Sequence, residues 1–419
     1  MPGASIISRF VLCVVACASP AWASAADPSP ASSPWRFTLR DGDRVVLLGG
    51  TFIEREQASG YLETALTARF PDQQIEFRNL GWSGDNVFGE ARAEFGTVAD
   101  GFAHLKEHVQ AIRPTVIFVN YGANESFEGK AGLDAFLAGF DKLLAVLDET
   151  KAHLVFLGPT PHEDLGRPLP DPAAHNRDLK QYGSAVASLA ARRGDPYVNL
   201  FELLGKKLDP PAGGPLTDNG IHLTDYGYWR AAAVIEQALG LPPRRWQVEI
   251  DAERGNVAAR GTSISDANIS STEIRFQALD ACLPLPPAPV GSLNVAVVMP
   301  STLRIFGLAS GRYALSCGDD QLATGTAQQF AAGIRLPAAC DAARSEQLRQ
   351  AIVTKNRLYF YRWRPQNDTY LFGFRRHEQG QNAAEIPQFD PLVDEQEAKI
   401  HALAVPVARS FRITRVNGN

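Results

Sequence analysis

Two kinds of apolar pattern alternate along the first half of the chain. Short runs of consecutive apolar residues are typical of strands that are covered on both faces. They occupy residues 43–50, 75–80, 115–121, 152–157 and 196–200. Segments in which apolar residues recur every three to four positions indicate amphipathic helices. They occupy residues 56–69, 98–112, 131–149, 173–194 and 224–239. This alternation predicts an α/β fold with a doubly wound parallel sheet.

The pattern changes near residue 241, where Pro242 and Pro243 close the α/β unit. Short alternating runs, separated by proline and glycine, then predict a small β-sandwich. These runs are WQVEI, EIRFQAL, LNVAVVM, LRIFGL and RYALSC. Helical spacing returns at 341–358, whereas 359–395 is aromatic and polar with little periodicity.

We therefore expect three parts after an N-terminal leader. The first is an α/β domain at 42–240, and the second is a β-rich domain at 246–340. The third, at 341–419, is a C-terminal helix with an aromatic tail that packs on the α/β domain.

The first 25 residues have the pattern of a bacterial-type secretory signal. Arg9 is the only charged residue before Asp27, and the apolar run at 10–18 is too short to span a bilayer. Small residues at 23–25 fit a cleavage site, so we expect the mature chain to begin with a leader at 26–41. A buried N-terminal helix is the alternative interpretation.

Export predicts a periplasmic or extracellular protein. A lipid anchor is an additional possibility, because residues 14–17 resemble a lipoprotein processing box that ends at Cys17. No later segment is long and apolar enough to predict a transmembrane helix.

Composition narrows the function classes. The chain has 45% hydrophobic and 21% charged residues, values typical of a soluble globular protein, and a net charge of −5. The mild acidity gives no reason to expect nucleic-acid binding. After removal of the signal, Cys282, Cys317 and Cys340 remain, and three thiols cannot all pair. No cysteine or histidine cluster has zinc-site spacing, and no nucleotide loop or flavin signature appears, so we expect no metal and no cofactor.

Polar residues and glycines gather where strands of the α/β unit end, and such ends are where sites form in these sheets. The segments are Gly49-Gly50-Thr51, NLGWSGD at 79–85, GANE at 122–125 and DNGIH at 218–222. Each has an ordinary structural explanation, such as a helix cap or a turn. Their joint order and placement favour a common site.

In that order, the segments resemble the four blocks of the SGNH (GDSL-type) hydrolase superfamily, over about residues 42–240. The second block supplies Gly84, the third Asn124 and the fourth His222. The resemblance implies a three-layer, flavodoxin-like fold and ester hydrolysis. It also implies that Gly84 N–H and the Asn124 side chain form an oxyanion hole and that His222 is the general base. Such donors are typically worth ~3 kcal/mol each.

Two positions depart from the family pattern. Thr51 stands where the family has its nucleophilic serine, and Asn219 replaces the aspartate three residues before the histidine. Thr51 keeps a hydroxyl that could attack a carbonyl, although its methyl group restricts the side chain. Asn219 could accept the imidazole N–H through its amide oxygen, but an Asp-to-Asn change in a serine triad costs ~10⁴ in rate. The adjacent Asp218 could replace the missing charge.

Other side chains are weaker candidates. Ser83 and Ser126 are alternative hydroxyls beside the second and third blocks, and we interpret Glu125 as loop support. The tail at 356–376 interleaves aromatic residues with arginines, so it is either a cap on the α/β unit or a substrate wall. In the second case Arg362, Trp363 and Arg364 would bind the substrate.

Two functions remain open on the sequence. The first is an exported esterase that acts on an acylated carbohydrate or another small extracellular ester. The second is a ligand- or polysaccharide-binding protein that has kept the fold but little or no activity. Partner proteins and oligomeric state are not predicted.

Overall fold

The structure is a computed structural model that describes residues 37–206, 214–289, 301–336 and 340–416. The predicted signal peptide, most of the leader, Cys17 and the run LNVAVVM at 293–299 lie outside the described residues.

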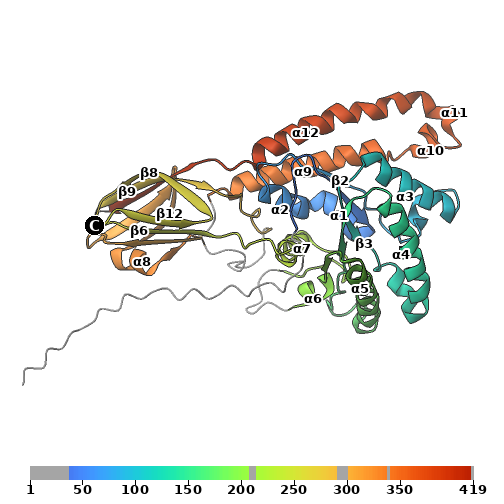
Figure 1. Ribbon diagram of the computed structural model, residues 1–419, viewed down its shortest axis with the longest axis horizontal. Helices are drawn as coiled ribbons and strands as arrows, with labels where there is room; N and C mark the ends of the chain where they lie inside the picture. Colours follow the sequence, from blue (N-terminus) through green and yellow to red (C-terminus); the bar gives the residue numbers. More distant parts are fainter. Residues whose placement is uncertain (1–36, 207–213, 290–300, 337–339, 417–419) are drawn as a thin grey trace, which may run out of the picture. The chain divides into compact units, whose positions relative to one another are not determined.

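A parallel five-stranded sheet with the order β2-β1-β3-β4-β5 forms the first half of the fold (Figure 1). Its strands are β1 (Arg44–Gly49), β2 (Glu76–Asn79), β3 (Val116–Asn120), β4 (His153–Leu157) and β5 (Tyr197–Val198). All four neighbouring pairs are parallel. The predicted doubly wound α/β fold is confirmed.

Helices connect these strands. They are α1 (Thr51–Ser59), α2 (Tyr61–Arg69), α3 (Val98–Ile112), α4 (Leu133–Asp148), α5 (Ala173–Arg193), α6 (Leu200–Gly205) and α7 (Asp225–Ala238), with short 3₁₀ segments η1 (Glu90–Ala93) and η2 (Glu125–Gly132). The helix predicted at 56–69 is in fact two helices. Gly60, at φ +66°, ends α1 and precedes α2. Helix α1 starts earlier than predicted, directly after β1.

The central strands are buried because both faces of the sheet are covered. Val46 and Leu48 pack in one core with residues of α3, α4 and α5. The intervening Val45 and Leu47 point to the opposite face and are equally inaccessible. On that side α7 contacts both α1 and α2. This double coverage explains the continuous apolar runs in the sequence.

The second half of the fold contains two further sheets. The first has the order β13-β10-β6-β7, and the second has the order β12-β11-β14-β9-β8. Their elements are β6 (Trp246–Asp251), β7 (Asn256–Arg260), β8 (Thr262–Ile269), β9 (Glu273–Asp280), β10 (Ser301–Phe306), β11 (Arg312–Cys317), β12 (Asp320–Thr326), α8 (Ala327–Ala332), β13 (Ile334–Arg335) and β14 (Arg409–Val416). One apolar core joins residues of both sheets, among them Ile250, Leu303, Phe276 and Leu315. This arrangement is a small sandwich.

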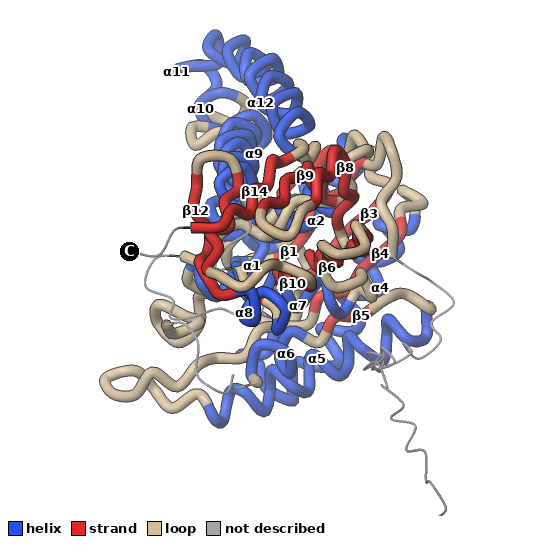
Figure 2. Tube along the Cα trace, turned by 90° about the vertical axis from the view of Figure 1, so that its left-hand side faces the viewer, coloured by secondary structure: helices blue, strands red, loops and turns tan. Residues whose placement is uncertain are grey.

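The end of the chain differs from the expected division into parts. Strand β14 lies between β9 and β11 and pairs antiparallel with both (Figure 2). The β-rich part therefore includes residues 246–289, 301–336 and 409–416, and the tail returns to it. Phe411 and Ile413 of β14 are buried in the core of the β-rich part, and this burial stabilises the pairing of β14 with β9 and β11.

The stretch of chain between β13 and β14 is more helical than the weak periodicity of residues 359–395 predicts. It contains α9 (Ala342–Trp363), α10 (Asp368–Leu371), α11 (Arg376–Gln379), η3 (Gly380–Gln388) and α12 (Phe389–Ala404). Helices α9 and α12 pack against each other, and α9 also contacts α1, α2 and β2. Because α9 buries residues against two different neighbours, its apolar positions do not form one narrow stripe.

A buried ion pair fixes α9 to the α/β unit. Lys355 Nζ lies 2.7 Å from Glu63 Oε1 of α2 and donates a second hydrogen bond to the carbonyl of Phe77 in β2. Asn356 Nδ2 donates to the other oxygen of Glu63 at 3.1 Å. Both charged side chains are almost fully buried. The C-terminal helix is thus held by specific polar contacts as well as by apolar packing.

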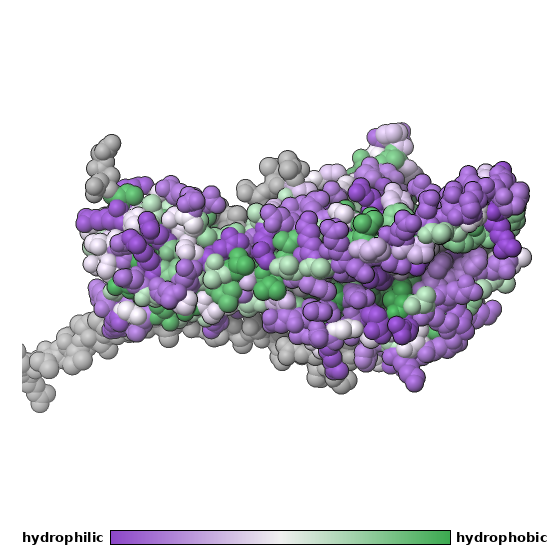
Figure 3. Space-filling model, turned by 90° about the horizontal axis from the view of Figure 1, so that it is seen from above, coloured by the Kyte–Doolittle hydropathy of each residue, from purple (hydrophilic) through white to green (hydrophobic). Residues whose placement is uncertain are grey.

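The surface seen in Figure 3 is mainly hydrophilic, with hydrophobic residues in small groups between the polar ones. Among the described residues, no helix is long and apolar enough to cross a membrane.

Candidate active site

Thr51 lies at the carboxyl edge of the parallel sheet. Strand β1 ends at Gly49, and Thr51 is the first residue of α1. Gly49 has to be a glycine because a Cβ atom there would lie 2.4 Å from the carbonyl oxygen of Asn120 in β3. Because β1 and β3 are adjacent and end at the same edge of the sheet, the Thr51 hydroxyl lies beside the loop that follows β3.

Gly84 connects three of the predicted blocks. Its backbone has φ +76°, a conformation that favours glycine. Its N–H donates to Thr51 Oγ1 at 3.2 Å, and its carbonyl accepts from Asn124 Nδ2 at 2.9 Å. The hydroxyl, the backbone N–H and the amide therefore meet at one place.

Asn219 and His222 form the fourth block. Asn219 Nδ2 lies 3.0 Å from His222 Nδ1, and Asn219 Oδ1 accepts the backbone N–H groups of Ile221 and His222. The expectation that the amide oxygen of Asn219 accepts the imidazole N–H is therefore wrong. That oxygen is held by the backbone, and the amide nitrogen faces the ring.

Asp218 does not take the place of the missing carboxylate. Its Oδ2 lies 3.5 Å from Arg55 Nη1, in an ion pair in which both side chains are about half exposed. Burial lowers the pKa of His222 below its usual value, the cation of Arg55 lowers it further, and Asp218 opposes this effect. The net shift favours the uncharged form of the ring.

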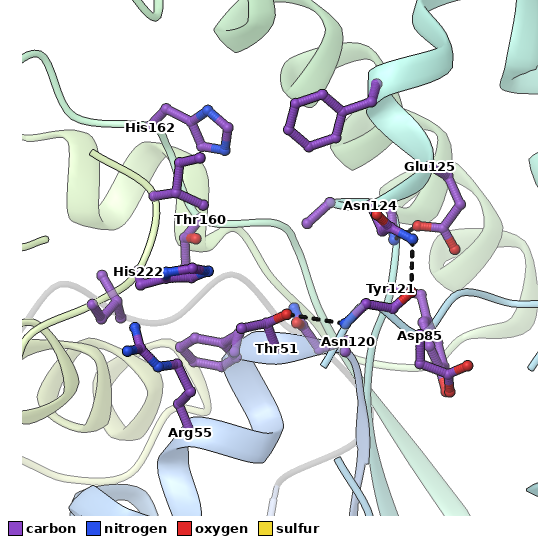
Figure 4. A pocket seen from close by; sticks show the side chains of 18 of the residues that line it. Thr51, Arg55, Asp85, Asn120, Tyr121, Asn124, Glu125, Thr160, His162 and His222 are labelled. Atoms are coloured by element: carbon purple, nitrogen blue, oxygen red, sulfur yellow. Dashed lines mark hydrogen bonds between the residues drawn. The ribbon is translucent and has the colours of Figure 1, made fainter. Parts of the chain in front are cut away.

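Thr51, Gly84, Asn124 and His222 line one cavity of about 230 Å³ (Figure 4). The four segments predicted to converge are thus brought together. Neither Asn219 nor Asp218 lines this cavity. Asn219 contacts His222 and Asp218 pairs with Arg55, and both of these partners do line it.

Arg55 and His162 are two of the lining residues that were not identified in the sequence. Arg55 follows Thr51 by one helical turn, so its guanidinium reaches the same cavity. His162 lies on the loop after β4, and burial lowers its pKa to about 4. His175 stacks on His162 with ring centres 4.6 Å apart. The sequence could have indicated Arg55, because it lies one helical turn after Thr51. No pattern in the sequence indicated that His162 lies at the cavity.

Buried polar contacts support the cavity wall. Asp85 Oδ2 accepts from Arg92 Nε at 2.7 Å and from the Tyr121 hydroxyl at 3.1 Å. Glu125 accepts the N–H groups of Val87 and Gly122, which agrees with the loop-support role expected for it. Burial raises the pKa of Glu125 to about 7. These contacts tie the second block to the third.

The alternative hydroxyls have other partners. Ser126 is fully buried, donates to the carbonyl of Ala123 and lies 3.1 Å from His175 Nε2. Ser83 is exposed, and its backbone N–H donates to Glu54. Neither serine lines the cavity.

The three tail residues expected to bind substrate also lie outside this cavity. Arg362 pairs with Asp390 on α12, and Trp363 packs against Trp82 and His108. Arg364 stacks on Trp82, with its guanidinium carbon 3.4 Å from a ring centre, and lies 3.4 Å from Glu54. This arrangement favours the structural cap over the substrate wall.

Within the described part of the chain, no group of three or more histidine, cysteine, aspartate or glutamate side chains could hold a metal ion.

Comparisons with known proteins bear on the family and the fold. Residues 42–230 match the GDSL-like Lipase/Acylhydrolase family. Among solved structures, BT4096, a gut microbial diltiazem-metabolizing enzyme, has a TM-score of 0.70 at 19% identity and covers 90% of this chain and 99% of its own. The likeness in fold therefore extends beyond the α/β unit.

Smaller solved structures resemble only part of the chain. The acetylxylan esterase Axe2 from Geobacillus stearothermophilus, as its D191A mutant, has a TM-score of 0.38 at 18% identity, over 49% of this chain and 98% of its own. LAE5, an alpha/beta hydrolase from the metagenome of Lake Arreo, Spain, has a TM-score of 0.38 at 19% identity, over 48% of this chain and 97% of its own. No curated protein matches the sequence. The family match covers residues 42–230, which carry the parallel sheet and the converging blocks, and it supports the assignment of this α/β domain to the SGNH (GDSL-type) hydrolase superfamily.

Proposed function

We propose that this protein is an exported ester hydrolase that removes a small acyl group from a carbohydrate or another extracellular ester. The observation that carries the proposal is the convergence of Thr51, Gly84, Asn124 and His222 on one cavity. The described residues do not include the predicted signal peptide, so export rests on the sequence pattern alone.

In the proposed reaction, Thr51 Oγ1 attacks the ester carbonyl. His222 Nε2 takes the hydroxyl proton, which requires the ring tautomer that carries its own proton on Nδ1. The carbonyl oxygen becomes an oxyanion that the N–H of Gly84 and Asn124 Nδ2 stabilise. Collapse of this intermediate breaks the bond to the alcohol, which leaves with the proton from His222, and the acyl group stays on Thr51. Water, activated by His222, then releases the acid.

Cavity size supports a small acyl group. The volume of about 230 Å³ is below the range of about 300–1,000 Å³ that is usual for drug-sized ligands. At its lining, Phe127 is 62% exposed and stacks on His175 with ring centres 4.0 Å apart. Such an exposed aromatic face suits a sugar ring, which supports a carbohydrate as the alcohol part.

A p-nitrophenyl acetate assay on the mature chain tests the proposal. The wild type should release p-nitrophenol faster than His222→Ala and Thr51→Ala, with both variants folded to the same degree by circular dichroism. Equal rates in the wild type and His222→Ala would exclude His222 as the base and reject the enzymatic function.

A second function, ligand binding with little turnover, is favoured by the Asn219 contact. Thr51 is a hindered nucleophile, and the amide nitrogen of Asn219 faces His222 Nδ1, where a triad places an acceptor. Under this function, Thr51→Ala would retain ligand affinity, and no ester would be turned over above the rate in buffer.

A further inference from the structure

The side-chain amide of Asn219 has only one possible orientation. Two backbone N–H groups, those of Ile221 and His222, lie 3.1 Å and 2.9 Å from the same side-chain atom of Asn219. Because both are donors, that atom is the carbonyl oxygen. The amide nitrogen must then be the atom 3.0 Å from His222 Nδ1. A flipped amide would set N–H groups against N–H groups.

This orientation determines where the neutral imidazole carries its proton. Asn219 Nδ2 is a donor only, so His222 Nδ1 has to be the acceptor and Nε2 carries the hydrogen. The imidazolium is disfavoured for the same reason, because its Nδ1 proton would face the amide protons. Among the described residues, Nδ1 of His222 is the only side-chain atom of this residue with a hydrogen-bond partner.

The cavity therefore presents several hydrogen-bond donors. They are Asn124 Nδ2, the Nε2–H of His222, the guanidinium of Arg55 and, once a ligand displaces Thr51 Oγ1 from it, the N–H of Gly84; all four residues line the cavity. Of the acidic side chains nearby, Asp218 pairs with Arg55, Asp85 pairs with Arg92, and both oxygens of Glu125 accept backbone N–H groups. None of these carboxylates offers an uncompensated charge to the cavity.

We propose that Asn219 keeps neutral His222 protonated at Nε2, and that the cavity is thereby a binding site for a carboxylate anion. This inference concerns the same cavity as the proposed function and deepens it, because the acid released by ester hydrolysis is such an anion. Bound acid occupies the donors that stabilise the oxyanion, so it inhibits competitively. The position of the His222 proton makes Asn219 a positioning residue that sets the balance between binding an acid and cleaving an ester.

Nitrogen-15 NMR of the histidine rings tests the tautomer directly. At about pH 8, above the usual histidine pKa of about 6.5, wild-type His222 should show a protonated Nε2 and an unprotonated Nδ1. Asn219→Asp should reverse this pattern, since its second oxygen accepts a proton from Nδ1 while the first keeps the backbone contacts. His222→Ala assigns the signals. A wild-type ring protonated at Nδ1, or an unchanged pattern in Asn219→Asp, would overturn the inference.

Titration with acetate and with acetamide tests the ligand class, since the two have nearly the same shape and differ in charge. We expect the wild type to bind acetate at least about fivefold more tightly than acetamide at about pH 8, and Asn219→Asp to lose this preference. Asn268→Asp is the matched control, because it adds the same charge at an exposed position of β8. Equal affinity of the wild type for both ligands would refute carboxylate binding.

The same measurements on Thr51→Ala separate this inference from the proposed function. If Thr51 is not a nucleophile, p-nitrophenyl acetate turnover does not depend on Thr51 and the proposed function fails. The His222 tautomer and the preference for acetate nevertheless persist in Thr51→Ala. If the tautomer is assigned wrongly, Thr51-dependent turnover can still be present while the NMR pattern contradicts the inference.

Discussion

The backbone nitrogen of Gly84 lies 3.2 Å from Thr51 Oγ1 and donates its hydrogen bond to this hydroxyl. The proposed attacking atom and a proposed oxyanion donor thus satisfy each other directly. A substrate carbonyl oxygen must replace the hydroxyl at Gly84 N–H before attack, which leaves the Thr51 oxygen adjacent to the carbonyl carbon. The contact therefore brings the proposed nucleophile and a proposed oxyanion donor together at one place.

Substitutions at position 51 test the role of this hydroxyl. Thr51→Ser should raise kcat/KM for p-nitrophenyl acetate several-fold, because it removes the methyl group that restricts rotation but keeps the oxygen. Thr51→Ala should reduce turnover to the background rate. Unchanged turnover in Thr51→Ala would assign the attack to another group.

Asn124→Ala tests the oxyanion hole. Asn124 Nδ2 donates to the carbonyl of Gly84 and has a second hydrogen for the substrate. Removal of one such donor typically lowers kcat by about 10²–10³-fold. We expect a loss in kcat with little change in KM, measured by steady-state kinetics. A rise in KM alone would mean that Asn124 binds substrate and transition state equally.

The sequence predicted those parts of the fold and site that depend on local patterns. Apolar runs and helical spacing predicted the order of the strands and of the longer helices up to residue 239, and the four blocks predicted Thr51, Gly84, Asn124 and His222 at the cavity. The orientation of individual side chains could not be predicted from the sequence. Whether Asn219 turns its oxygen or its nitrogen to His222 depends on two backbone donors whose direction only the folded loop fixes. Likewise, the pairing of 409–416 with β9 and β11 is a long-range contact that local pattern does not encode.

Arg364→Ala and Arg362→Ala distinguish a structural cap from a substrate wall. Arg364 lies 3.4 Å from Glu54, and Glu54 accepts the N–H of Ser83 beside Gly84. Arg364→Ala should therefore lower kcat about tenfold through a displaced Gly84, which is ~1.4 kcal/mol, with KM little changed. Arg362→Ala should alter neither, because this side chain pairs with Asp390. An increased KM in both variants would support direct substrate contact.

Lys355→Met should destabilise the fold strongly. Removal of this cation leaves Glu63 buried without its charge partner, and breaking such a pair costs about 3–5 kcal/mol. Urea unfolding measures the loss. The double variant Lys355→Met/Glu63→Gln should recover part of it, since no charge is then left buried.

Lys180→Met is the control for this prediction, because its pair with Glu202 is more than half exposed and should contribute about 0–1 kcal/mol. An equal loss in Lys180→Met and Lys355→Met would mean that burial of the pair is unimportant.

Glu56→Gln should change how stability depends on pH. Glu56 is fully buried, and burial raises its pKa to about 8 in the folded state, against 4.5 as the ordinary value. Between these two values the folded protein binds a proton that the unfolded chain has released, so wild-type stability falls as pH rises from about 5 to about 8. Glutamine does not titrate and can keep the hydrogen bond from the Leu62 N–H. The free energy of unfolding of the wild type, relative to Glu56→Gln, should therefore decrease by on the order of 3 kcal/mol over this range. Urea unfolding of both proteins at several pH values measures this difference, in which the other titrating groups cancel. A constant difference would show that Glu56 titrates in the folded protein as it does in the unfolded chain.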